Sequence, residues 1–140
     1  MTTIVCTRAG MVADRRISSD VIFLSKKLFL INGSIYGICG DIEQAIKFLD
    51  WRRNPDQKPQ FAEISDIEIL ELTPDARMLR WSSELVGVEI DNDYYAIGSG
   101  AQLALGALSM GATPQQAIRI ASKWDTSTGT EIQTMKLKAK

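Results

Sequence analysis

The pattern of apolar and polar positions predicts a β-hairpin at the start of the chain. Residues 2–7 alternate β-branched and small side chains as far as a turn at Ala9-Gly10, and residues 11–14 form a second strand that ends in an acid, Asp14. The residues that follow read as a loop or a strand extension and then a short apolar stretch before Ser25.

A second hairpin is predicted at Asn32-Gly33, a dipeptide that is the strongest short-range signal for a two-residue turn. The antiparallel register that follows from this turn pairs Lys27 with Ile38. Lys27 is therefore expected beside the segment that ends in Gly40.

The remaining residues alternate between helical and strand periods. A helical period begins after Asp41, a suitable N-cap, and ends near Arg53. The face expected to be buried carries Ile42, Ala45, Ile46 and Leu49. The later segments are predicted, in chain order, as a meander of strands at 67–72, 78–82 and 86–90 that turns into a fourth strand at 94–98, helices at 101–111 and 114–123, a loop at 124–129 and a strand at 131–137. Together these elements predict a layered α+β sandwich.

The amino-acid composition limits the kinds of catalytic and metal-binding site that the chain can form. The chain has 140 residues, of which 45% are hydrophobic, so it can bury a core as one domain over residues 1–140. It contains no histidine, which excludes histidine-based acid–base catalysis and the usual zinc sites, so hydrolytic chemistry would need another base. Cys6 and Cys39 are too few and too far apart for a zinc motif and are expected to be buried in strands.

Charge and hydropathy indicate the compartment. The net charge of -1 gives no general attraction to nucleic acid or to acidic lipid. No signal peptide and no apolar run of about 18 residues is found, so we expect no membrane contact and a cytoplasmic location.

Several polar residues lie at predicted strand ends and turns, where functional groups are often placed. They are Thr2, Asp14, Lys27, Gly98-Ser99-Gly100 and Asp125-Thr126-Ser127-Thr128-Gly129. Each alone has an ordinary structural explanation, because strand threonines, solvated acids and flexible Gly-Ser-Gly turns are common. If Met1 is removed, however, Thr2 carries a hydroxyl nucleophile and a free amine, the base that it needs, on one residue.

In their order along the chain, these segments resemble the proteasome β-type family of N-terminal nucleophile (Ntn) hydrolases, which includes the HslV peptidase. The matching segments are 2–5, 12–16, 27–31, 36–40, 96–100 and 125–129, so the resemblance runs almost from end to end. It implies a four-layer αββα sandwich of two antiparallel sheets. It also implies a threonine endopeptidase that degrades protein substrates in a homo-oligomeric ring.

The resemblance also implies a role for each matching residue. Thr2 would be the nucleophile, Lys27 held by Asp14 would lower the pKa of its amine, and the Gly40 N–H would stabilise the oxyanion. Ser99, Asp125 and Thr128 would orient the amine and relay a proton. Arg16 and Ser18 would line the substrate groove, and Ile38 would shape the side-chain pocket. Lys26 rivals Lys27, although the Asn32-Gly33 register favours Lys27.

The chain departs from the family pattern after residue 54, where a Pro-rich segment replaces the second long helix of the family. The helical layer after the first sheet should therefore be shortened, which bears on assembly more than on catalysis. The expected partners are further copies of the chain, protein or peptide substrates and an AAA+ ATPase unfoldase. No cofactor or metal is required, although the resemblance allows a structural monovalent or divalent cation near the Asp125 loop.

Two alternatives stay open. The chain could be a non-catalytic or unprocessed assembly protein with the same fold, or an Ntn amidase that acts on small amides. The complete set of Thr2, Asp14, Lys27, Ser99, Asp125 and Thr128 favours the peptidase.

Overall fold

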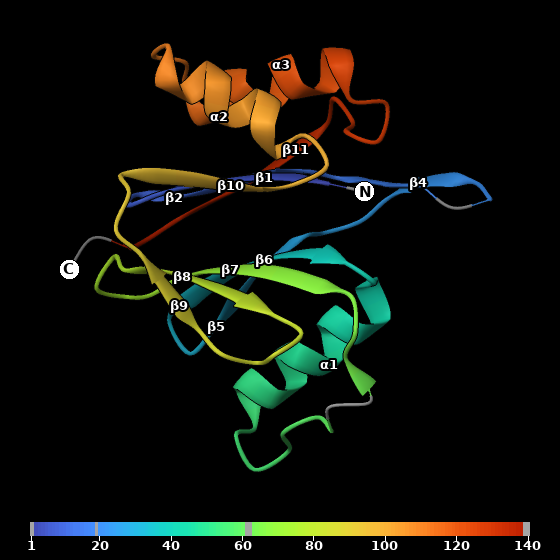
Figure 1. Cartoon of the computed structure of the whole chain (residues 1–140), viewed down its shortest axis with the longest axis vertical. Coiled ribbons are helices and arrows are strands. Elements are labelled where there is room, and N and C mark those ends of the chain that lie inside the picture. Colours follow the sequence, from blue (N-terminus) through green and yellow to red (C-terminus); the bar gives the residue numbers. More distant parts are fainter. Residues whose placement is uncertain (1, 19, 61–62, 139–140) are drawn as a thin grey trace.

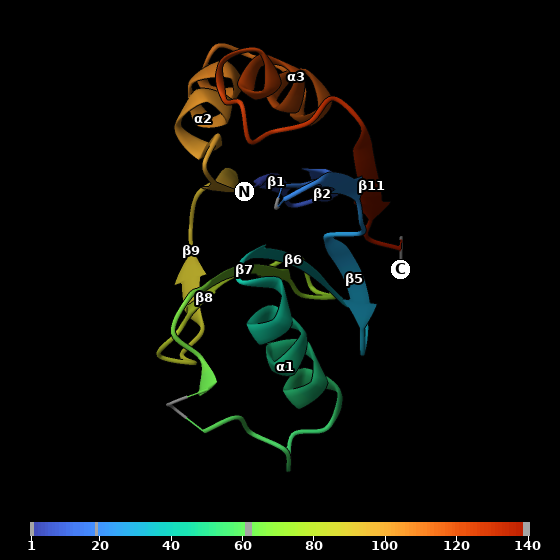
Figure 2. The ribbon, with the colours of Figure 1, turned by 90° about the vertical axis from the view of Figure 1, so that its right-hand side faces the viewer.

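Two antiparallel sheets lie face to face between two helical layers, as Figures 1 and 2 show in perpendicular views. The computed structural model of the chain describes residues 2–18, 20–60 and 63–138. The first sheet contains strands from both ends of the described chain, and the second sheet contains strands from its middle. The predicted four-layer sandwich is confirmed.

The first sheet is built around the N-terminal strand. Its strands, hydrogen-bonded in this order, are β10 (Tyr94–Gly98), β1 (Thr3–Thr7), β2 (Gly10–Asp14) and β11 (Ile132–Lys136). The first hairpin is the predicted one, with Val5 opposite Val12. Because β1 has a neighbour on each side, the residue that precedes it enters the sheet between two strands.

Helices α2 (Ala101–Ser109) and α3 (Pro114–Trp124) cover the outer face of the first sheet. Their positions agree with the sequence prediction within a few residues. Thr113 caps α3 in a capping box, in which its side chain accepts from the Gln116 N–H and the Gln116 side chain accepts from the Thr113 N–H.

The second sheet contains five strands in sequence order. They are β5 (Leu28–Ile31), β6 (Ser34–Gly40), β7 (Ile67–Leu72), β8 (Met78–Ser82) and β9 (Val88–Ile90). The β5–β6 turn has positive φ at both Asn32 (51°) and Gly33 (83°), the conformation that suits a tight hairpin. The Ile38 N–H donates to the Lys27 carbonyl at 3.0 Å, so the predicted register is confirmed.

The predicted fourth strand of the meander belongs to the other sheet, which corrects the sequence prediction. β10 pairs with β1 and not with β9, and Ala96 lies opposite Val5. The alternation of apolar residues defines a strand but does not identify its neighbour. In the chain segment that links β2 of the first sheet to β5 of the second, β3 (Arg16–Ser18) and β4 (Ile22–Leu24) pair as a separate two-stranded ribbon with exposed apolar side chains on β4.

Helix α1 (Ile42–Arg53) covers the outer face of the second sheet. Asp41 caps it as predicted, accepting from the Gln44 N–H at 3.0 Å. The buried face is rotated from the predicted one, because Phe48 is fully buried whereas Ile46 is 46% exposed. Between Arg53 and Ile67 no described residue lies in an α-helix, so the helical layer after the first strands is shortened as predicted, although it covers the second sheet and not the first.

The rotation of α1 follows from an aromatic cluster. The Phe48 ring meets Tyr36, Trp51 and Trp81 edge-on, at centroid distances of 6.1, 5.6 and 5.4 Å. Large aromatic side chains bury more area than isoleucine, and edge-to-face pairs add to that gain. Both cysteines are buried as predicted, and no helix in the described ranges is long and apolar enough to span a membrane.

We predict that Phe48→Ala lowers the free energy of unfolding by about 3–5 kcal/mol, the usual cost of removing a buried phenylalanine ring. Ile46→Ala, on the exposed side of the same helix, should cost less than about 1 kcal/mol. Urea denaturation of the two variants provides the measurement. Similar losses would show that the helix face has been assigned wrongly.

Candidate active site

A buried ion pair connects the two sheets. Asp14 ends β2 in the first sheet, and Lys27 directly precedes β5 in the second. The Lys27 Nζ lies 3.0 Å from Asp14 Oδ1, and neither side chain is more than 1% exposed. Lys26 is exposed, so the structure distinguishes the two rival lysines and places Lys27 in the interior.

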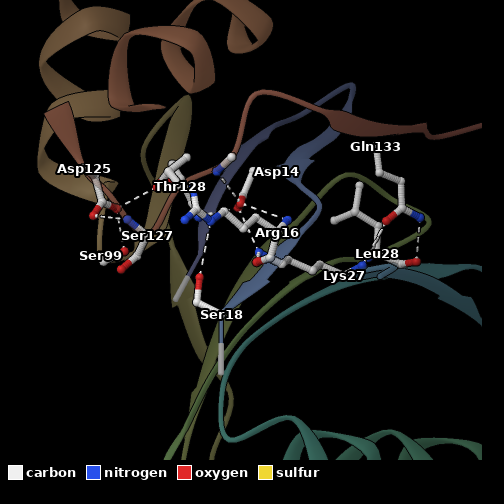
Figure 3. A network of polar contacts seen from close by, with 12 residues as sticks. Asp14, Arg16, Ser18, Lys27, Leu28, Ser99, Asp125, Ser127, Thr128 and Gln133 are labelled. Atoms are coloured by element: carbon white, nitrogen blue, oxygen red, sulfur yellow. Dashed lines mark hydrogen bonds and ion pairs between the residues drawn. The ribbon is translucent and has the colours of Figure 1, made fainter. Parts of the chain in front are cut away.

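The Asp14 carboxylate accepts hydrogen bonds from backbone N–H groups of three segments. Its oxygens accept from the backbone N–H of Thr3 at 2.9 Å, of Arg16 at 3.2 Å and of Gly129 at 2.9 Å. With Lys27 these donors compensate a charge that would otherwise be costly to bury. Asp14 thereby fixes the start of β1, the start of β3 and the loop before β11 relative to one another (Figure 3).

The Lys27 ammonium is held by Asp14 and by the Arg16 carbonyl, which accepts from Nζ at 2.7 Å. Burial lowers the pKa of Lys27 below its ordinary value, and the charge and hydrogen bond of Asp14 act in the opposite direction. Removal of Asp14 would therefore remove the group that favours the charged lysine.

A second polar cluster surrounds Asp125, the C-cap of α3. Asp125 Oδ2 accepts from Ser99 Oγ at 2.5 Å and from Thr128 Oγ1 at 2.6 Å, and Oδ1 accepts from the Ser127 N–H at 3.1 Å. Burial acts to raise the pKa of Asp125, but these hydrogen bonds outweigh it, and the pKa lies below its usual value. The predicted residues Ser99, Asp125 and Thr128 are thus brought together (Figure 3).

Thr3 joins the two clusters, a role that no sequence pattern indicated. Its backbone N–H donates to Asp14, and its Oγ1 lies 2.7 Å from Thr128 Oγ1. A Cβ at position 100 would overlap with Thr3 Oγ1, so Gly100 permits this approach. The Gly98-Ser99-Gly100 segment is therefore packed closely against the start of β1.

Thr2 directly precedes β1, has only 5% of its surface exposed and lines a cavity of about 350 Å³. Lys27, Ile38 and Gly40 line the same cavity. Gly40 has φ +96°, and a Cβ there would lie 2.5 Å from the Asp66 carbonyl oxygen, so this position requires glycine. The cavity thus brings together the proposed nucleophile, the lysine and the segment expected to stabilise an oxyanion.

The residues predicted to bind substrate are divided between two positions. Ser18 and Ile38 line the cavity, together with Ile17, Ile42 and Ala45. Arg16 does not line it. Its carbonyl holds Lys27, and its Nε donates to Ser18 Oγ at 3.3 Å. Arg16 therefore contacts two residues that line the cavity, Lys27 through its carbonyl and Ser18 through its side chain.

Metal-binding groups are sparse in the described ranges. No group of three or more His, Cys, Asp or Glu side chains is placed there to hold a metal ion. No cation is required there by the sequence resemblance, which only allowed one near the Asp125 loop, and both carboxylate oxygens of Asp125 accept hydrogen bonds.

The sequence matches no protein-family model and no curated protein. The structure, in contrast, is similar to solved structures over almost its whole length. HslV from Trypanosoma brucei has a TM-score of 0.74 and 18% identity, with 98% of this chain and 99% of that chain covered. BPH from Thiobacillus denitrificans has a TM-score of 0.72 and 17% identity, with 99% of each chain covered.

A third structure, an Anbu (Gly-1) mutant from Hyphomicrobium sp. strain MC1, has a TM-score of 0.72 and 13% identity, with 99% of this chain and 88% of that chain covered. BPH has also been solved in complex with epoxomicin. These similarities show that the chain has the HslV-like, proteasome-type fold of the Ntn hydrolases, as the sequence resemblance predicted.

We predict that Asp14→Asn lowers the free energy of unfolding by about 3–5 kcal/mol, because it leaves the buried Lys27 charge without its partner. Asp50→Asn is the matched control, since Asp50 pairs with Arg53 at 3.1 Å on an exposed helix surface. Its cost should stay below about 1 kcal/mol. Equal losses in denaturant titrations would contradict a stabilising role for the buried pair.

We also predict that Thr3→Val costs about 1–3 kcal/mol, because it removes a buried hydroxyl that bonds to Thr128 and retains the side-chain shape. Thr7→Val, on the same strand, removes a hydroxyl that accepts only an exposed N–H from Ala9 at 3.2 Å and should be nearly neutral. Thermal and urea unfolding measure both. A neutral Thr3→Val would mean that the two clusters are independent.

Proposed function

We propose that this chain is a threonine-type endopeptidase in which Thr2 is the nucleophile once its α-amine is free. The observation that carries the proposal is the position of Thr2 in the cavity, beside Lys27 in its lining and directly before Thr3. Thr3 connects the buried Lys27–Asp14 pair to the cluster of Ser99, Asp125 and Thr128. The fold of HslV is consistent with this reaction.

In the proposed reaction, Thr2 Oγ attacks the carbonyl carbon of a peptide bond while its own amine accepts the hydroxyl proton. The protonated amine then passes this proton to the departing amine of the substrate, which leaves an ester on Thr2. Water attacks the ester, with the amine again as base, and frees the carboxylic acid and the Thr2 hydroxyl.

Lys27 would act on the base rather than on the substrate. An α-amine has a reference pKa of about 8, and a nearby ammonium group lowers it, so that more of the amine is neutral near pH 7. With no histidine in the chain, this amine is the base that the proposal requires. The Gly40 N–H would stabilise the oxyanion, and Ser99, Asp125 and Thr128 would orient the amine.

The cavity supports a substrate class. Its walls include the apolar side chains of Ile17, Ile38, Ile42 and Ala45. We therefore infer that the enzyme cleaves protein or peptide chains after an apolar residue. Self-assembly into a ring, an AAA+ ATPase partner and a cytoplasmic location stay predictions.

We predict that protein with a verified N-terminal Thr2 hydrolyses fluorogenic peptides with leucine before the cleaved bond faster than peptides with aspartate there. Thr2→Ala should lower kcat/KM at least about a thousandfold, because it removes the nucleophile. Thr7→Ala, further along the same strand, is the control and should retain activity.

Unchanged hydrolysis by Thr2→Ala would disprove the mechanism. No hydrolysis by wild-type protein whose N-terminus is confirmed as Thr2 by mass spectrometry would instead favour a non-catalytic protein of the same fold.

A further inference from the structure

The side chain of Gln133 reaches from the first sheet to the second at Lys27, the residue that directly precedes β5. Gln133 lies on β11, and its Oε1 accepts from the backbone N–H of Lys27 at 2.9 Å and of Leu28 at 3.1 Å. Its Nε2 donates to the Leu28 carbonyl at 3.0 Å. Figure 3 shows these contacts beside the Lys27–Asp14 pair.

These three hydrogen bonds satisfy backbone groups at the edge of the second sheet. β5 is the edge strand of the second sheet, so one side of its backbone has no neighbouring strand in that sheet. A glutamine amide carries the same donor and acceptor groups as a peptide unit and can satisfy such an edge. On the other side, the Ile38 N–H donates to the Lys27 carbonyl at 3.0 Å. The Lys27 backbone is therefore held from both sides.

Gln133 and Asp14 belong to neighbouring strands of the same sheet. In the β11–β2 register Ile132 lies opposite Asp14, and Gln133 lies opposite Ala13. The lysine is therefore bound to the first sheet at both ends, through its backbone by Gln133 and through its ammonium by Asp14. Gln133 itself does not line the cavity.

We propose that Gln133 is a positioning residue of the active site, which fixes the Lys27 backbone so that the ammonium stays beside Asp14 and Thr2. This inference rests on the proposed peptidase function. It concerns catalysis more than substrate binding, because Gln133 acts through Lys27 and does not itself line the cavity.

The test compares Gln133→Met, which keeps the length of the side chain and removes all three hydrogen bonds, with Gln102→Met, the same change at an exposed position of α2. In Gln133→Met we expect kcat to fall roughly tenfold with KM little changed, since the base is less well tuned. Gln133→Glu keeps the acceptor for the Lys27 and Leu28 N–H groups but loses the donor and adds a negative charge, so we expect a loss of kcat smaller than in Gln133→Met.

The pH dependence separates positioning from a general loss of structure. With Lys27 displaced, the pKa of the Thr2 amine should rise, so the acid limb of kcat/KM should move to higher pH. The charged and titratable groups around this amine are Asp14, Lys27, Cys39, Asp41 and Asp125. The control variant retains all of them in place and should keep the wild-type limb.

A measurement without catalysis keeps this test separate from the test of the proposed function. Acetylation of Lys27, followed by mass spectrometry with the exposed Lys26 as internal reference, should be slow in wild type and several-fold faster in Gln133→Met. If wild type hydrolyses no peptide, the peptidase proposal fails, while the labelling still reports on Gln133. The positioning role is overturned if labelling and the acid limb in Gln133→Met match those of Gln102→Met, or if activity falls only in proportion to the folded fraction.

Discussion

The buried pair of Asp14 and Lys27 is the constraint on which the rest of the structure depends. Each sheet contributes one charge, and neither side chain is more than 1% exposed. An unpaired charge in such a place would be prohibitive, so the two sheets must meet in one alignment. Because Asp14 also accepts three backbone N–H groups, the same alignment sets the start of β1 and the loop before β11.

A buried ion pair is seldom the most stable way to join two layers, since apolar side chains of similar size often stabilise as well or better. Its presence between two apolar sheets therefore favours a chemical role over a purely structural one. The surroundings agree with this interpretation, because the polar groups of Thr3, Thr128 and Asp125 continue from the pair in one connected network. Stability and the proposed chemistry thus use the same atoms.

Much of this arrangement could be predicted where the signal is local. The Asn32-Gly33 turn fixed the register that brings Lys27 opposite Ile38, and Asp41 defined the start of α1. The partner of β10 and the roles of Thr3 and Gln133 could not be predicted, because each depends on contacts between distant segments. Thr3 looked like any strand threonine, and Gln133 like any polar residue in an alternating strand. The rotated face of α1 depends on aromatic packing with residues of the sheet, which a helical period does not contain.

The order of the strands has a further consequence for the time at which the site can form. The second sheet uses only residues 28–90, and its neighbouring strands are consecutive in the chain. The first sheet needs β11, and the network at Thr3 needs Thr128, which lies 125 positions later. Contacts between such distant segments form slowly and require the whole chain. During synthesis, the second sheet can therefore fold first, and the C-terminal segment determines when Thr2 and Thr3 reach their final surroundings.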